Sequence, residues 1–220
     1  MSLGFSFDAG SLPPDEAIPK AKAAATKALS LDGSLAEAHT SLGHMKLHYD
    51  WDFPGAETEF KRSLELNPGY AQAHHWYSHL LTASGRLDES LAEGRRALEL
   101  DLLSSTMNVH LGWNYFFARQ YDLALGQFAK TLELDPNYGL AHWYRGLSLE
   151  QQHQYTEALV KLRRSEEILK GNVAIAATIG RVHALSGNRR EAERVLTATT
   201  IEPLCGSKRP TRSAPISSCI

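Results

Sequence analysis

Cysteine and long apolar runs are both scarce in this chain of 220 residues. Its two cysteines, Cys205 and Cys219, both lie in the last 20 residues, and two are too few for a disulfide framework or a thiolate zinc site. Charged residues interrupt the apolar stretches well before the length that a membrane span needs, and the first 20 residues lack the basic-then-apolar layout of a secretion signal. We therefore expect no membrane segment within the chain and a cytoplasmic location.

The sequence also lacks the short motifs that mark common enzymes and nucleic-acid-binding proteins. It contains no phosphate-cradling glycine loop, no nucleophile elbow and no His-Glu metalloprotease motif. Residues 161–220 hold 11 Lys and Arg against 5 Asp and Glu, but no aromatic interleaving accompanies this basic excess, so solvated helix faces explain it. We predict a non-catalytic protein that needs no cofactor and does not bind nucleic acid directly.

What the sequence does contain is an internal repeat. Small residues recur 34 or 35 positions apart at Gly43, Ser78, Gly112, Gly146 and Gly180. A second small series, spaced 34 throughout, runs through Ala56, Ser90, Ala124, Ala158 and Ala192, and four residues after its members stand Phe60, Gly94, Phe128, Leu162 and Leu196. A small residue on each of two helices lets their backbones pack closely while the larger side chain fills the space beside them. The repeat predicts paired helices, with weaker packing at Gly94.

Turn signals separate the helices of each pair and the pairs from one another. Gly85-Arg86-Leu87-Asp88 is one tight turn within a pair, and units end in Leu-Asn-Pro or Leu-Asp-Pro at Pro68 and Pro136, where proline stops a helix. The segments around the turns have apolar residues at helical spacing and few β-branched residues. The predicted fold class is all-α, built from helix hairpins.

These residues resemble the signature of the tetratricopeptide repeat family. The resemblance rests on Leu42-Gly43, Leu111-Gly112, Ala56, Phe60, Ala124, Phe128 and Pro136, and it covers about residues 15–199. It implies an α-solenoid, a right-handed superhelix of antiparallel helix hairpins, with about five repeats after an N-terminal half repeat. We place the half repeat at 15–35 and the repeats at 36–70, 71–104, 105–138, 139–172 and 173–199, between an irregular segment at 1–14 and a disordered tail at 200–220.

The family implies a scaffold that binds a protein or peptide in its concave groove. Carried over residue by residue, the groove positions are His44, His48, His75, His79, Trp113, Phe116, Phe117, Trp143 and Gln151. The groove would then be rich in histidine toward its start and in aromatic rings toward its end. Aromatic rings anchor peptide side chains because they bury a large area and lose little conformational entropy.

The histidines of this predicted groove allow a second interpretation. His44/His48 and His75/His79 each place two imidazoles one helical turn apart, a spacing that can chelate a metal. No carboxylate stands nearby at ligand spacing, so we interpret all four as half-buried polar groove residues rather than metal ligands. Partly protonated below about pH 6.5, they would favour an acidic peptide.

A narrower resemblance leaves other functions open. Leu12-Pro13-Pro14, Ala21-Lys22-Ala23, Tyr49-Asp50-Trp51-Asp52 and Ala73-His74-His75-Trp76-Tyr77 look like the tetratricopeptide regions of bacterial signalling proteins, namely winged-helix regulators, Ser/Thr kinases and adenylate cyclases. The chain would then be a sensor or oligomerisation arm cut from a larger transcriptional regulator or protein kinase, periplasmic if that parent spans a membrane. Its uncapped ends would also allow self-association. A third alternative is the tetratricopeptide part of a glycosyltransferase, although 220 residues leave no room for the catalytic domain.

One unit departs from the regular spacing. An extra residue stands between Gly43 and Ala56, in the aromatic connection Tyr49-Asp50-Trp51-Asp52-Phe53-Pro54. We expect its rings to cover the hairpin, because Trp and Tyr tend to bury themselves, and a partner-binding loop is the alternative.

Overall fold

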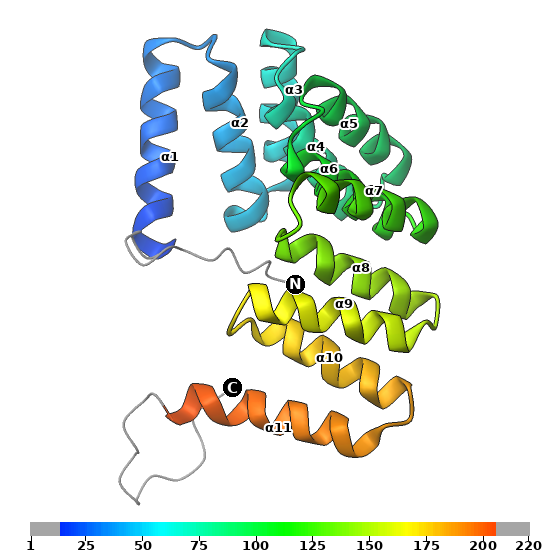
Figure 1. The fold of residues 1–220 in the computed structure, drawn as a ribbon. Coiled ribbons are helices and arrows are strands. Elements are labelled where there is room, and N and C mark those ends of the chain that lie inside the picture. The colour runs from blue at the N-terminus through cyan, green and yellow to red at the C-terminus, as the bar shows by residue number, and fades with distance from the viewer. Residues whose placement is uncertain (1–13, 206–220) are drawn as a thin grey trace, which may run out of the picture. The chain divides into compact units, whose positions relative to one another are not determined.

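The computed structural model describes residues 14–205, which are helical throughout apart from short connections and contain no strand. This confirms the predicted all-α class. The chain divides into two compact units, unit 1 in residues 1–134 and unit 2 in residues 135–220, and Figure 1 shows the helices of each. Of the irregular segment predicted at 1–14, residues 1–13 lie outside the described residues, and so do residues 206–220 of the tail predicted at 200–220.

Each unit is a series of antiparallel helices joined by short turns. Unit 1 contains α1 (Pro14–Leu31), α2 (Ala36–Met45), a π-helical segment η1 (Lys46–Asp50), α3 (Phe53–Leu66), α4 (Ala71–Ala83), α5 (Leu87–Leu100), α6 (Ser105–Phe117) and α7 (Tyr121–Leu134). Unit 2 contains α8 (Gly139–Gln151), α9 (Tyr155–Ile168), α10 (Val173–Leu185) and α11 (Arg189–Cys205). The last helix therefore continues six residues past the end predicted at 199. Within residues 14–205, every helix is too short or too polar to span a bilayer.

The helix pairs pack at the small residues that the sequence repeat marks. A Cβ atom added to Gly112 would lie only 2.5 Å from Cε1 of Phe128, and one added to Gly43 would lie 2.7 Å from Cε1 of Phe60. Both phenylalanines are fully buried. The hairpins α2–α3 and α6–α7 thus close on a glycine that faces a large ring, which confirms the predicted packing.

The hairpin at Gly94 is packed differently from the hairpins that have phenylalanine at the equivalent position. The side chain of Asn114 on α6 occupies the space, because a Cβ at Gly94 would lie 2.6 Å from Asn114 Nδ2. That amide nitrogen donates a hydrogen bond of 3.0 Å to the carbonyl of Ser90. A polar side chain from the next repeat therefore replaces the missing apolar one.

In every hairpin, the turn residue at the same position of the repeat has the left-handed backbone conformation. Its φ is positive at Trp51 (55°), Gly85 (75°), Arg119 (60°), His153 (60°) and Gly187 (83°), and these residues are 34 positions apart. Glycine adopts this conformation without strain, whereas a residue with a Cβ atom does so at a cost.

The extra residue of the first full repeat lies in η1. A π-helical turn holds one residue more than an α-helical turn, so it accommodates the insertion before the hairpin turn at Trp51. Trp51 is 67% exposed and does not cover the hairpin, which corrects the expectation for this ring. Phe53, by contrast, packs against the core of Leu47 and Phe60.

Candidate functional site

The first helices of the hairpins in unit 1 form a continuous layer. Besides its own hairpin partner α5, helix α4 contacts both α2 and α6. Side chains on the shared face of these three helices therefore lie near one another. Most of the predicted groove residues of unit 1 are on this face or at its ends.

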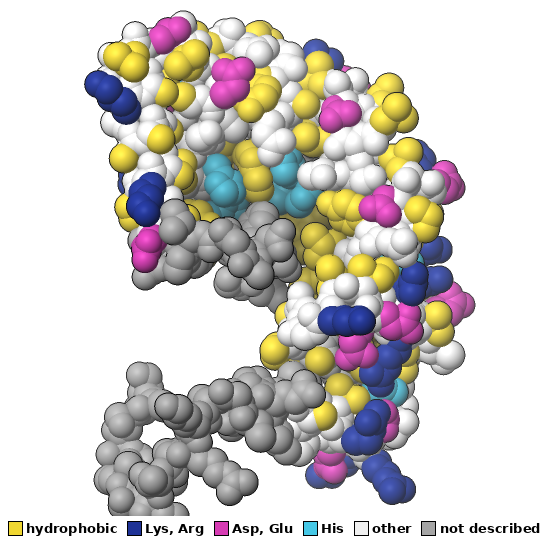
Figure 2. All heavy atoms as spheres, turned by 60° about the vertical axis from the view of Figure 1, so that its left-hand side comes forward, with side chains coloured by type: hydrophobic (Ala, Val, Ile, Leu, Met, Phe, Trp, Pro, Cys, Tyr) yellow, Lys and Arg dark blue, Asp and Glu magenta, His cyan; other side chains and the backbone are white. Residues whose placement is uncertain are grey.

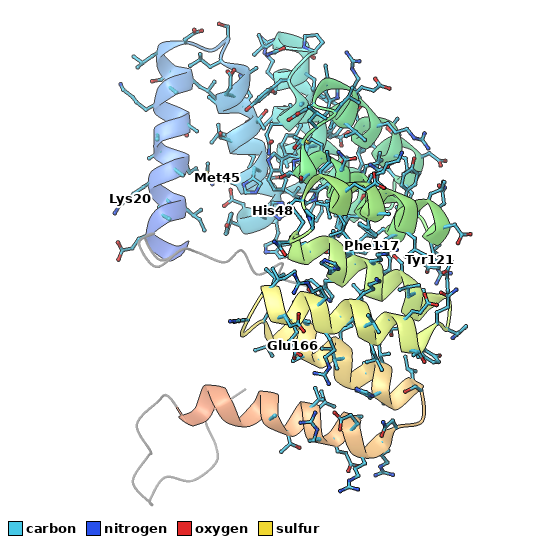
Figure 3. The ribbon with its side chains drawn as sticks, viewed as in Figure 1. Lys20, Met45, His48, Phe117, Tyr121 and Glu166 are labelled. Atoms are coloured by element: carbon cyan, nitrogen blue, oxygen red, sulfur yellow. The ribbon has the colours of Figure 1, made fainter. Side chains whose placement is uncertain are left out.

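Five histidines gather on this face, and we call His44, His48, His75, His79 and His110 the histidine cluster. The ring centroids of His44 and His48 are 4.6 Å apart, those of His75 and His79 are 4.7 Å apart, and those of His79 and His110 are also 4.7 Å apart. Nδ1 of His110 and Nε2 of His79 lie at a hydrogen-bonding distance of 2.9 Å. Figure 2 shows histidine side chains of unit 1 at the surface beside hydrophobic ones, and Figure 3 labels His48 at the end of this layer.

The aromatic rings intermingle with the histidines instead of following them. The centroid of Trp76 lies 4.2 Å from that of His44 and 5.1 Å from that of His79. Trp113 stacks on His79, with centroids 4.5 Å apart and planes inclined by 16°, and Phe117 follows at 4.5 Å from Trp113. We call His44, Trp76, His79, Trp113 and Phe117 the ring series.

Sequence reasoning missed two residues of this site, Trp76 and His110. Both stand two positions before a small residue of the repeat, namely Ser78 and Gly112. Aligning the repeats at their small residues would have placed the two side chains in one column, three positions before the column that holds His44, His79 and Trp113 and therefore on the same helix face.

The cluster histidines are held in their neutral form. Burial, with a smaller contribution from His48, lowers the pKa of His44 to about 4, and burial lowers the pKa of His110 to about 4. Burial, and then the neighbouring His110, lower the pKa of His75 and His79 well below the ordinary value. The rings therefore stay uncharged near pH 6.5, and a positive charge that could attract an acidic peptide would develop only at lower pH.

Two other histidines have a structural role that sets them apart from the cluster. Nδ1 of His74 lies 2.5 Å from a carboxylate oxygen of Glu93, and Nε2 lies 3.0 Å from the carbonyl oxygen of Pro68. His39 repeats this arrangement with Glu59 at 2.7 Å and with the carbonyl of Gly33 at 3.3 Å. Both nitrogens of each ring have a partner, so these side chains tie the two helices of a hairpin together.

The predicted aromatic groove residues of unit 1 differ in exposure. Trp113 is 9% exposed, whereas Phe117, at the end of α6, is 42% exposed and is labelled in Figure 3. Phe116 is half-buried, and its ring lies nearly perpendicular to that of Phe117 with centroids 5.3 Å apart. Trp113 is therefore almost fully buried, whereas Phe117 presents its ring to the surface.

In unit 2, the structure places Trp143 and Gln151 on α8. Trp143 is 8% exposed, and its indole N–H donates to the hydroxyl of Thr178 on α10 at 3.4 Å. Gln151 is exposed at the end of the helix. Beside it, the buried carboxylate of Glu150 accepts a hydrogen bond of 2.7 Å from Arg181.

Comparison with known proteins gives distant relatives with a common repeat. Anaphase-promoting complex subunit 3 of Schizosaccharomyces pombe (strain 972 / ATCC 24843) is 22% identical over 156 residues, which cover 71% of this chain and 23% of that protein. Tetratricopeptide repeat protein 13 of Homo sapiens is 26% identical over 107 residues, which cover 49% of this chain and 12% of that protein. The chain thus spans less than a quarter of the length of these curated relatives.

Solved structures show the same fold. The type IV pilus biogenesis factor PilW superposes with a TM-score of 0.77 at 18% identity, covering 88% of this chain and 89% of that one. YrrB, described as a tetratricopeptide protein with an unusual peptide-binding site, gives a TM-score of 0.58 at 22% identity and covers 83% and 94%. The tetratricopeptide repeat family matches residues 52–101 and 110–172, just over half of the chain. Together with the regular period and the hairpins in which a glycine packs against a phenylalanine ring, this match shows that the chain belongs to the tetratricopeptide repeat family.

Proposed function

We propose that the chain is a non-catalytic scaffold that binds a peptide segment of another protein along the layer formed by α2, α4 and α6. The observation that carries this proposal is the ring series, which runs from one hairpin to the next with centroids 4.2–5.1 Å apart. A continuous row of rings offers a rigid apolar track that loses little entropy when a peptide binds.

Two similar proteins support this proposal. YrrB is described as having a peptide-binding site, and anaphase-promoting complex subunit 3 is part of a multi-protein complex. A stack of helix hairpins has a rigid extended surface that suits an extended or helical segment.

Within the proposed groove, the residues have different tasks. The buried Trp113 and His79 form its floor, whereas the half-buried Trp76 and the exposed Phe117 meet the ligand. In unit 2, we propose that Trp143 supports the corresponding surface of α8 and that Gln151 contributes a polar contact there.

The experiment is selection from a displayed peptide library, followed by affinity measurement with Phe117→Ala and Leu123→Ala. Both side chains are exposed apolar groups, but Leu123 lies on α7, outside the layer. We expect selected peptides to bind Phe117→Ala roughly 30-fold more weakly, the loss typical of a truncated anchor, and to bind Leu123→Ala as they bind the unchanged chain. Equal binding to both variants, or a library that yields no enriched peptide, would count against this groove.

A further inference from the structure

We propose that His75, His79 and His110 form a binding site for a divalent transition-metal ion of the zinc type. Each ring offers one nitrogen, and the three nitrogens lie within 4.8 Å of one another. In a tetrahedral zinc site with bonds of about 2.0–2.1 Å, the ligand nitrogens are about 3.4 Å apart. The observed His79–His110 distance of 2.9 Å is slightly shorter than this spacing and the 4.8 Å limit for the set is longer, so ring rotations would have to bring the three nitrogens to the bound geometry.

The three ligands stand on rigid elements. His75 and His79 are one turn apart on α4, and His110 is on α6, which contacts α4 directly. Two imidazoles at this helical spacing form a chelating pair, and the third closes the site from the adjacent repeat. Sites built on packed helices hold their ligands more accurately than sites on loops.

The nitrogen atoms are available for a metal. Nε2 of His75 is buried without a hydrogen-bond partner, an arrangement that is unfavourable unless another group binds there. His79 and His110 face each other with one nitrogen apiece. A neutral imidazole carries one proton, and when each ring holds it on the nitrogen that faces away, both facing nitrogens offer lone pairs.

A neighbouring amide is placed to orient the first ligand. The side-chain amide nitrogen Nε2 of Gln72 lies 3.3 Å from Nδ1 of His75. Turned over by about 180°, this amide would present its oxygen to the ring, accept a hydrogen bond from Nδ1–H and leave Nε2 for the metal. Such a contact to the far nitrogen is the usual way in which proteins fix a metal-binding imidazole.

The contrast with His39 and His74 separates this site from ordinary structural histidines. Those two rings have a carboxylate on one nitrogen and a backbone carbonyl on the other. In the cluster, by contrast, Nε2 of His44, His48 and His75 is buried without a partner. A set of three imidazoles suits zinc, copper and nickel, and it leaves one tetrahedral position for water.

The test is titration of the full chain with Zn²⁺ alone at neutral pH by calorimetry, after removal of bound metal with a chelator. We expect one saturable equivalent in the unchanged chain. His110→Gln and His79→Gln should each weaken it by more than about tenfold. His153→Gln, the same substitution at an exposed position, and the double variant Cys205→Ser/Cys219→Ser should leave the affinity unchanged. Unsaturable binding, or equal affinity in the cluster variants, would overturn the proposal.

A second measurement guards against variants that lose their fold. Nitrogen NMR of the imidazoles in the unchanged chain, with and without Zn²⁺, should show large shifts for His75, His79 and His110 and none for His153. Shifts confined to other histidines would overturn the proposal even if the variants unfold. Phe117→Ala should keep its zinc affinity, so that failure of the peptide groove and failure of the metal site can be told apart.

Discussion

Replacing Gly112 by alanine tests the packing on which each hairpin depends. The new methyl group would lie 2.5 Å from Cε1 of the fully buried Phe128, whereas carbon atoms in contact are normally about 3.5–4.0 Å apart. The ring or the helix must therefore move by about 1 Å. Overpacking of this kind costs about 1–3 kcal/mol, and the better helix propensity of alanine returns about 0.5–1 kcal/mol.

Gly126 provides the matched control. It also lies inside a helix, α7, but a Cβ added there meets nothing within 4 Å. Gly126→Ala should therefore raise the free energy of unfolding by about 0.5–1 kcal/mol, so the two alanine variants should differ by about 2 kcal/mol. For a chain of this size, that difference corresponds to about 4–8 °C in melting temperature.

The assay is thermal and urea unfolding followed by circular dichroism, completed by a double-mutant cycle with Phe128→Ala. Once the ring is removed, Gly112→Ala should no longer destabilise, and the coupling free energy should be about 1–3 kcal/mol. If Gly112→Ala and Gly126→Ala shift the unfolding transition equally, or if the cycle shows no coupling, the close approach of α6 and α7 does not limit the size of this residue.

Three further predictions concern single residues. The pKa of His44 is about 4 in the folded chain and ordinarily 6.5, so as the pH falls the unfolded chain binds a proton at this residue before the folded chain does. Protonation of His44 should therefore lower the free energy of unfolding by about 2 kcal/mol between pH 7 and pH 5. In the presence of a chelator, His44→Gln should reduce that acid sensitivity in urea unfolding, and an unchanged pH dependence would contradict the assignment. Asp52→Ala should cost about 1 kcal/mol, since Asp52 Oδ1 accepts a 2.9 Å hydrogen bond from the Gly55 N–H at the start of α3, and Asp52→Asn should restore most of it. Arg119→Gly should raise the melting temperature, because the left-handed φ of 60° strains a residue with a Cβ by about 1 kcal/mol, and a lower melting temperature would argue against strain at this turn.

The hairpins were predictable from sequence because their contact is between residues at fixed positions of the repeat. Gly43 and Phe60 belong to two series that recur through the chain, so the period itself indicates which residues meet. The exception at Gly94 was also visible, but its partner was not. Asn114 comes from the following repeat, and the spacing within one hairpin carries no information about such a contact.

The candidate site was only partly predictable for the same reason. His75 and His79 stand four residues apart and are recognisable as a pair, whereas His110 has no such neighbour on its own helix. Its relation to the pair depends on how α6 lies against α4. Exposure was equally hidden, since Trp113 and Phe117 are adjacent in space and yet differ greatly in exposed fraction.

The π-helical segment η1 has a consequence for the spacing of the first full repeat. The match to the repeat family begins at residue 52, directly after Trp51. The α2–α3 hairpin, which includes residues on both sides of this point, nevertheless packs Gly43 against Phe60 as the other hairpins pack their equivalent residues. One inserted residue thus shifts the sequence out of step with a fixed period while the left-handed turn keeps its 34-residue spacing from the next hairpin. An insertion absorbed within a helical turn thus leaves the packing of the two helices of the hairpin unchanged.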